Sequence, residues 1–302
     1  MALIECVPNV SEGRRPDVVN AIAEAVSRVD AVRLLDRSSD EAHNRSVLTV
    51  AGQAPAVQQA VMALFTTALD LIDLRHHTGA HPRLGAVDVV PFIPLAGATM
   101  AQCVALATET ASMVAARFQL PVYLYEEAAA TPGRRNLADI RRGEFEGLAA
   151  KMATPEWAPD YGPSRPHPKA GATVIGARPP LIAFNVNLAT DRLDIAKAVA
   201  AAVRHSSGGL PFVKALGIPL PHRGIVQVSM NLTDFTHTPM TRAFAAVRDE
   251  AARRGATVVD SEIVGLVPEA ALPADPEQTL KIAAFSRNQV LEHRLEDVVG
   301  NR

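Results

Sequence analysis

The sequence predicts an α/β protein of the α+β type, built from two ferredoxin-like split βαβ subdomains. Length is the first observation behind this prediction, because 302 residues exceed what one compact core usually holds. The second is the order of the predicted elements, which is β-α-β-β-α-β in each half of the chain. We place the boundary after residue 178, giving subdomains 1–178 and 179–302, and we expect a ligand cleft between them.

The first half contains apolar segments whose spacing and flanking residues assign them to strands or helices. Pro16 and Pro55 suit the first turn of a helix, and Thr99 with Gln102 forms a capping-box signature. The polar residues 37–45 indicate a loop between two strands. The predicted strands span residues 3–8, 31–36, 46–50, 86–92 and 122–125, and the predicted helices span 16–29, 55–71, 99–118 and 137–148.

The second half repeats this order of elements without repeating the residues. Thr190 is placed to cap one helix, and Pro239 and Gly255 bound another. The strand over residues 224–232 alternates apolar and polar side chains, which is typical of a half-buried strand. The predicted strands span residues 181–188, 212–216, 224–232 and 257–264, and the predicted helices span 191–204 and 239–254.

Composition and charge argue against several classes of function. The formal net charge is −2, so the chain lacks the basic face that nucleic acid demands. Two cysteines, Cys6 and Cys103, cannot form a disulfide framework and fit a reducing compartment. The N-terminus does not resemble a signal peptide, and no run of about 20 apolar residues occurs. We therefore expect a cytoplasmic protein with neither nucleic acid nor membrane as a partner.

Residues 73–94, D-L-R-H-H-T-G-A-H-P-R-L-G-A-V-D-V-V-P-F-I-P, place a loop rich in ionisable groups directly before a buried strand. Pro82 holds the preceding His81 in an extended conformation, and Gly79 and Gly85 let the backbone turn on either side. An imidazole on such a stiffened loop, close to Arg83, suits proton transfer near neutral pH. We name His81 as the candidate general acid/base; the alternative is a surface loop with incidental histidines.

The same loop contains a D-x-x-H-H-x-x-x-H spacing that resembles a set of metal ligands. It lacks the i, i+4 placement of histidines on a helix that zinc motifs use. We therefore expect no metal ion.

A second polar cluster, S-S-D-E-A-H-N-R, occupies residues 38–45. Asp40 or Glu41 is suited to orienting an imidazole, and His43 and Arg45 are suited to contacting a carboxylate. The alternative is a solvated loop between two strands.

Residues 154–168 change character, because they are rich in proline and contain the only tryptophan. Prolines stiffen linkers, but the glycines at Gly162 and Gly171 also let a ligand approach the backbone closely. A linker and a ligand-binding crossover both fit this composition.

Asn185 and Asn187 lie two residues apart on a predicted strand, so their side chains share a face. The two amides either form hydrogen bonds within a buried polar network or bind a polar heterocycle.

Several stretches resemble the glutamate formiminotransferase family in its standalone form, without a cyclodeaminase domain. They occur in the family's order and cover nearly the whole chain. These stretches are I-E-C-V-P-N-V-S-E-G-R-R, H-N-R-S-V-L-T-V, H-P-R-L-G-A-V-D-V-V-P-F-I-P, P-V-Y-L-Y-E-E-A, P-E-W-A-P-D-Y-G-P and G-A-T-V-I-G-A-R-P-P-L-I-A-F-N-V-N-L. The chain departs from the family at Ala80, where an acidic residue is usual, and at Ser38, which matches an acidic position of the fused enzymes.

This resemblance implies transfer of a formimino group from N-formimino-L-glutamate to N5 of tetrahydrofolate, a co-substrate, in histidine degradation. It also implies two α/β subdomains, a homodimer, and His81 as the catalytic histidine. Arg45 and Arg83 become candidates for binding substrate carboxylates, and Asn185 and Asn187 for binding folate. The family's folate-binding stretch falls on Gly162, Pro163, Ser164, Arg165, Pro166, His167, Pro168, Lys169, Ala170 and Gly171.

Three alternatives stay open at this point. A metal-dependent amidine or amide hydrolase would use the same histidines. A folate-binding module would have no activity of its own. Within the family, the donor would carry a formyl group in place of the formimino group.

Overall fold

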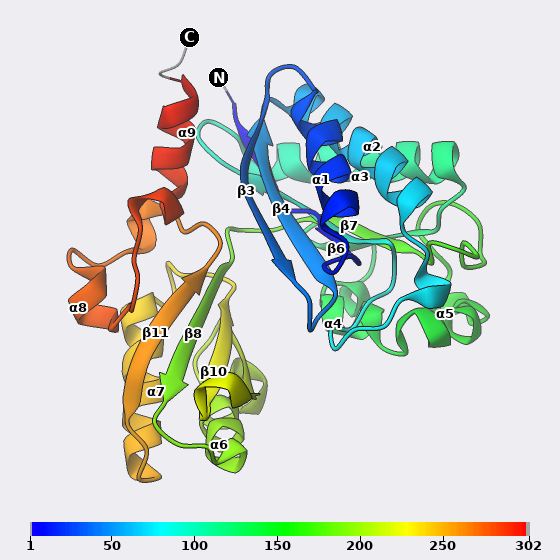
Figure 1. The fold of residues 1–302 in the computed structure, drawn as a ribbon. Helices are drawn as coiled ribbons and strands as arrows, with labels where there is room; N and C mark the ends of the chain where they lie inside the picture. The colour runs from blue at the N-terminus through cyan, green and yellow to red at the C-terminus, as the bar shows by residue number, and fades with distance from the viewer. Residues whose placement is uncertain (1, 300–302) are drawn as a thin grey trace. The chain divides into compact units, whose positions relative to one another are not determined.

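The computed structural model describes residues 2–299, and the chain forms two compact units that divide between Arg178 and Pro179 (Figure 1). Each unit has its own β-sheet and its own hydrophobic core. The predicted mixed α/β fold class is therefore confirmed. No helix within residues 2–299 has the length and apolar character needed to cross a membrane.

The sheet of the first unit begins with a strand that Pro8 interrupts, giving β1 and β2. Both pieces lie between β4 and β5, β3 pairs outside β4, and the pairs around β1 and β2 are antiparallel, as a split βαβ arrangement requires. Strands β7 and β6 extend the sheet beyond β5 as parallel neighbours. The bounds are β1 (Ile4–Cys6), β2 (Asn9–Val10), β3 (Val32–Asp40), β4 (Arg45–Gly52), β5 (Val87–Pro94), β6 (Val122–Glu126) and β7 (Thr173–Ala177).

Helices cover this sheet on both faces. Helices α1 (Pro16–Ser27), α2 (Ala54–Leu71) and α3 (Met100–Phe118) share the larger core with it. The short helices α4 (Leu137–Arg141) and α5 (Glu144–Met152) pack Ile140, Leu148 and Met152 against Tyr123 and Tyr125 of β6 in a separate cluster. In β4, Leu48 and Val50 belong to the larger core, so Arg45 lies on the opposite face of the strand.

The second unit is a four-stranded antiparallel sheet in the order β11-β8-β10-β9, the ferredoxin-like order. Phe184 and Val186 of β8 join helices α6 and α7 in the core, whereas Asn185 and Asn187 lie on the other face. The bounds are β8 (Ile182–Leu188), α6 (Leu193–Val203), β9 (Val213–Leu220), β10 (Ile225–Leu232), α7 (Met240–Arg253), β11 (Val258–Val264), α8 (Pro276–Leu280) and α9 (Leu291–Val299).

The structure corrects the predicted polar loop over residues 37–45. Strand β3 continues to Asp40 and β4 starts at Arg45, so only four residues form the turn. The polar residues are accommodated because Ser38 pairs with Val47 and Ser39 pairs with Ser46 in the ladder. The hydroxyls of Ser39 and Ser46 lie 2.8 Å apart. Cross-strand pairing thus outweighed the polar composition.

Other local predictions were confirmed or corrected. The capping box of Thr99 and Gln102 is formed at the start of α3. The predicted helix 137–148 is broken at Gly143, whose φ of 91° lies in the left-handed region. Thr190 does not cap α6 directly, because its hydroxyl accepts from Arg192 N, one residue before the helix begins. Strand β7 was not predicted, because it lies within a glycine-containing segment and pairs only with distant strands.

Candidate active site

The side chains of Asp40 and Asn44 stabilise the turn between β3 and β4, whose sequence is D-E-A-H-N. The Asp40 carboxylate accepts from His43 N at 2.8 Å and bonds the His43 ring Nδ1 at 2.7 Å. Asn44 adopts φ of 50°, a conformation that asparagine tolerates, and its side chain accepts from Gly13 N and donates to Thr78 O. The position and the rotamer of His43 are therefore fixed by local hydrogen bonds.

The His81 loop docks on this turn. Ala80 N donates to Ala42 O at 3.1 Å. A Cβ added to Gly79 would lie 2.3 Å from His43 O, so only glycine permits this approach. The ring centroids of His43 and His81 are 6.1 Å apart with an interplanar angle of 72°. Two imidazoles from separate segments thus face each other.

Charged groups surround His81 from three elements. Asp88 of β5 accepts from Leu84 N at 2.6 Å and from Gly85 N at 3.3 Å, and its second oxygen pairs with Arg141 of α4. Partial burial, followed by the positive charges of Arg45 and Arg141, lowers the pKa of His81 to about 3, although Asp88 opposes this. His81 is therefore neutral at physiological pH and able to accept a proton.

Arg45 and Arg141 are the two cations beside His81, and Arg45 has fewer hydrogen-bond and ion-pair partners than Arg141. Its Nε atom is buried and has no hydrogen-bond partner among residues 2–299. Burial and the neighbouring Arg141 lower its pKa to about 10, so it stays charged at neutral pH. A buried guanidinium of this kind is suited to binding a carboxylate.

Arg83, the other predicted carboxylate-binding residue, already has acidic partners. Its guanidinium contacts Glu144 at 3.0 Å and Glu146 at 2.5 Å, and its Nε donates to His77 Nδ1 at 3.1 Å. His77 in turn bonds Asn44 O through Nε2 at 2.9 Å. The structure therefore places Arg83 as a link between the His81 loop and α5.

The residues of the metal-like spacing have separate partners. Asp73 pairs with Arg75 at 2.6 Å, and His77 is bonded as described above. Within the described part of the chain, no group of three or more His, Cys, Asp or Glu side chains is placed to hold a metal ion.

The end of the crossover at residues 162–171 lies beside residues 84–86, between His81 and β5. Ala86 N donates to Ala170 O at 3.1 Å, Ala172 N donates to Leu84 O at 3.2 Å, and Leu74 N donates to Lys169 O at 2.9 Å. His167 and Gly171 exchange two backbone hydrogen bonds of 2.8 Å, and the His167 ring accepts from Ala170 N at 3.0 Å. The end of the crossover is thus joined to the segment that carries His81.

Gly162, at the start of the crossover, lies against a different part of the unit. A Cβ there would meet Leu120 O at 2.5 Å, and its φ is 86°. Gly162 therefore makes a close approach to the backbone before β6, while Gly171 makes one to Leu84.

Asn185 and Asn187 belong to a polar network on the sheet of the second unit. Asn185 Nδ2 donates to Glu262 at 3.0 Å, and Asn187 Nδ2 donates to Asp260 at 2.5 Å. Gln227 donates to both Asn187 Oδ1 and Glu262 at 2.9 Å. The amides therefore orient two carboxylates, of which Asp260 also pairs with Arg223 at 2.7 Å.

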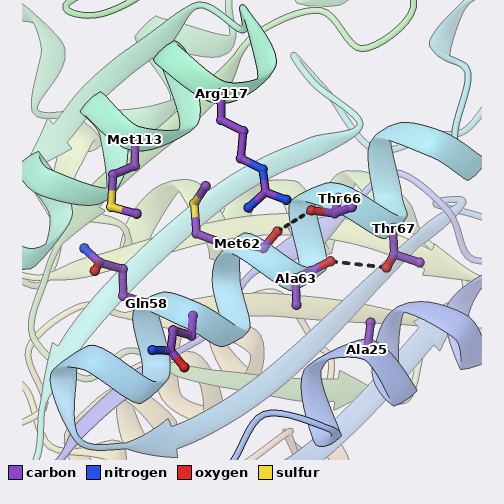
Figure 2. A pocket seen from close by; sticks show the side chains of 9 residues that line it. Ala25, Gln58, Met62, Ala63, Thr66, Thr67, Met113 and Arg117 are labelled. Carbon is purple, nitrogen blue, oxygen red and sulfur yellow. Dashed lines mark hydrogen bonds between the residues drawn. The ribbon is translucent and has the colours of Figure 1, made fainter.

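A groove of about 470 Å³ lies elsewhere, between helices α1, α2 and α3 (Figure 2). Thr66 and Thr67 line it, but their hydroxyls donate back to Met62 O and Ala63 O of the same helix. Arg117 is its one charged lining residue, and none of the predicted site residues lines it. The groove therefore offers no chemistry for proton transfer.

Two side chains near His81 were not among the predicted site residues. Asp88 is a carboxylate inside an otherwise apolar strand, which is a signal for function or for a buried ion pair. Arg141 belongs to an Arg-Arg run that resembles a solvated face, and only its ion pair with Asp88 of β5 identifies its role.

The fold and this cluster define a two-unit α/β protein with paired histidines beside a buried cation. Its sequence matches the formiminotransferase domain, N-terminal subdomain, over residues 3–178 and the formiminotransferase domain over residues 183–282. The chain belongs to the formiminotransferase family.

Curated relatives agree with this assignment. A protein named glutamate formimidoyltransferase from Thermoplasma acidophilum is 47% identical over 98% of both chains. One of the same name from Streptococcus pyogenes serotype M1 is 42% identical over 97% of this chain and 98% of the relative. Formimidoyltransferase-cyclodeaminase from Rattus norvegicus is 43% identical over 99% of this chain but only 56% of the relative.

Proposed function

We propose that this protein transfers the formimino group of N-formimino-L-glutamate to N5 of tetrahydrofolate and releases L-glutamate. The observation that carries the proposal is the match over nearly the full length of both chains to relatives named glutamate formimidoyltransferase. The His81 environment supports the proposal, because the transfer needs a neutral base beside cationic groups. Tetrahydrofolate is a co-substrate here, and no metal takes part.

The chemistry requires a proton to leave N5. Attack of N5 on the formimino carbon gives a tetrahedral intermediate whose N5 carries an extra proton. A substituted arylamine nitrogen of this kind is acidic and gives up its proton even to a weak base. A histidine that is neutral because of burial and nearby arginines is such a base, and general-base catalysis typically contributes about 10²- to 10⁴-fold.

Arg45 is the proposed binding group for a substrate carboxylate. Both substrates carry glutamate carboxylates, and a charged guanidinium with an unpaired buried Nε is able to donate a hydrogen bond to a carboxylate of either one. Arg83 is the weaker candidate, because Glu144 and Glu146 already compensate its charge.

The folate-binding role of residues 162–171 and of Asn185 and Asn187 stays a prediction, as does a cleft between the two subdomains. Support for the crossover is its hydrogen bonding to Leu84 and Ala86, which follow His81. For the second unit, the support is that Asn185 and Gln227 orient Glu262, while Asn187 orients Asp260. Carboxylates are suitable acceptors for the donor edge of a pterin.

A homodimer and a cytoplasmic location also belong to this proposal. The free, buried Cys6 and Cys103 are compatible with a reducing compartment. Light scattering of the purified chain at several concentrations tests the dimer.

The deciding experiment is an anaerobic steady-state assay with tetrahydrofolate and either formiminoglutamate or formylglutamate. We expect turnover with formiminoglutamate, release of one glutamate per turnover, and no change after exhaustive chelation. A preference for formylglutamate would reassign the donor. Folate binding without turnover would favour a binding module, and folate-independent release of glutamate that needs added zinc would favour the hydrolase.

A further inference from the structure

His43 occupies a position in the site that the role of His81 leaves unexplained. Its ring faces the His81 ring at 6.1 Å, and Asp40 holds it through Nδ1 at 2.7 Å. The His43 side chain is 45% exposed, so a substrate is able to reach it. A carboxylate bonded to Nδ1 fixes the orientation of the imidazole, as in carboxylate–imidazole pairs of acid/base sites.

The reaction also contains a step that suits His43 better than His81. The C–N bond to glutamate breaks only if that nitrogen takes a proton, because an aliphatic amide anion of this kind is a very poor leaving group. Arg45 and Arg141 disfavour a proton on His81, whereas the His43 ring is bonded to the Asp40 carboxylate at 2.7 Å and is open to solvent. One ring thus lies beside two cations and the other is held by a carboxylate, and such a difference in surroundings is how acid and base roles are divided between paired groups.

We propose that His43, held by Asp40, is the general acid that protonates the departing glutamate nitrogen, while His81 accepts the proton from N5. This inference rests on the proposed function and names a second catalytic residue for it.

The atoms and electrons balance over one turnover. The N5 electron pair forms the new bond to the formimino carbon as the π pair of its C=N bond moves onto the imino nitrogen, and the N5 proton passes to His81. That pair then re-forms the C=N bond while the bond between the carbon and the glutamate nitrogen breaks. The electron pair of the broken bond stays on the glutamate nitrogen, which takes the proton of protonated His43. Glutamate leaves as the amine, and the proton on His81 returns to His43 through solvent, which reaches the exposed His43 ring.

A matched control exists in the second unit. Asp234 and His237 form the same D-x-x-H turn, with His237 N donating to Asp234 at 3.3 Å and the ring Nδ1 bonding it at 2.8 Å. The His237 ring packs on Phe212 rather than on a second imidazole. Removing His237 therefore removes the same local hydrogen bonds without removing an imidazole pair.

The experiment compares His43→Ala, His43→Gln, His81→Ala and His237→Ala by kcat, tetrahydrofolate affinity and melting temperature. We expect both His43 variants to lose roughly 10²-fold in kcat at unchanged folate affinity and melting temperature, and His237→Ala to stay within about twofold. Added imidazole should restore part of the activity of His43→Ala through its protonated form, so the rescue declines as pH rises through the pKa of free imidazole. Rescue of His81→Ala should show the opposite trend.

Retention of kcat within threefold by both His43 variants would overturn the inference, and so would a rescue of His43→Ala that grows with pH. A smaller loss in Asp40→Asn than in His43→Ala is expected, because that variant keeps the acid and loses only the carboxylate. If neither the wild type nor His237→Ala transfers the formimino group, the proposed function itself fails. Activity in the wild type together with full activity in His43→Gln removes only the role of His43.

Discussion

The imidazole of His81 lies opposite that of His43, with 6.1 Å between ring centroids and 72° between ring planes. The two residues come from loops separated by α2, and Ala80 N donating to Ala42 O joins those loops. The structure therefore places a second imidazole opposite the histidine that the sequence indicated as the catalytic one.

Replacing His81 should affect chemistry rather than folding or folate binding. We expect His81→Ala to lower kcat by roughly 10²-fold or more, because the base proposed to accept the N5 proton is lost. Calorimetric titration with tetrahydrofolate should give an affinity close to that of the wild type. Loss of activity through a collapsed melting transition would falsify this assignment.

Arg45 should tune the pH dependence of His81. Because the charge of Arg45 helps to lower the pKa of His81, Arg45→Gln should raise that pKa. The base then becomes protonated at a higher pH, so the acid limb of the kcat/KM profile should shift to higher pH. The exposed Arg75, which pairs with Asp73, provides the control, and Arg75→Gln should leave the limb in place. An unshifted limb in Arg45→Gln would remove Arg45 from the surroundings of His81.

Acid should destabilise the fold through His81. Its folded pKa of about 3 lies below the unfolded value of about 6.5, so between these values only the unfolded chain binds the proton. Stability is full above about pH 6.5 and falls as pH drops towards 3, by at most about 1.4 kcal/mol per pH unit from this residue. Urea unfolding at pH 7 and 5 should show a smaller fall for His81→Gln than for the wild type or for His76→Gln at the exposed His76. Equal falls in all three proteins would contradict the prediction.

Gly171 should tolerate no side chain. Its φ is 70°, and an added Cβ would lie 2.1 Å from Leu84 O. We expect Gly171→Val to lower the free energy of unfolding by about 1–3 kcal/mol or more through backbone strain, and to weaken tetrahydrofolate binding. Gly133→Val, at a glycine with no atom within 4 Å of an added Cβ, should be close to neutral. If Gly171→Val keeps its folate affinity while His81→Ala loses it, the crossover is only a linker.

Asn187 connects two partners, Asp260 and Gln227, each of which would lose a hydrogen bond without it. In Asn187→Leu, Asp260 loses a donor and Gln227 loses an acceptor, which should cost about 1–3 kcal/mol in stability or in tetrahydrofolate binding. Asn231→Leu on the neighbouring strand is the comparison, because Asn231 is exposed. Calorimetry and urea unfolding of both variants separate the two effects. Unchanged values for Asn187→Leu would place the network outside the folate site.

The sequence by itself determined most of the elements and the likeness to a family. Local signals were enough where the energy is local, as in the Thr99 capping box and the Pro16 start of α1. The glycines and the proline around His81 also indicated a stiff loop, because their conformational restrictions do not depend on distant residues.

Only the tertiary structure decided which polar residues share the site. In the sequence, Arg83 and Arg45 are equal candidates for binding a substrate carboxylate. In the structure, α5 supplies carboxylates to Arg83, whereas no described residue bonds the buried Nε of Arg45. Strand β7 formed inside a glycine-containing segment because β5 and β6 pair with it. His43 faces His81 for the same reason: pairing and loop docking join residues that are distant along the chain, and burial and charge then set what each of them is able to do.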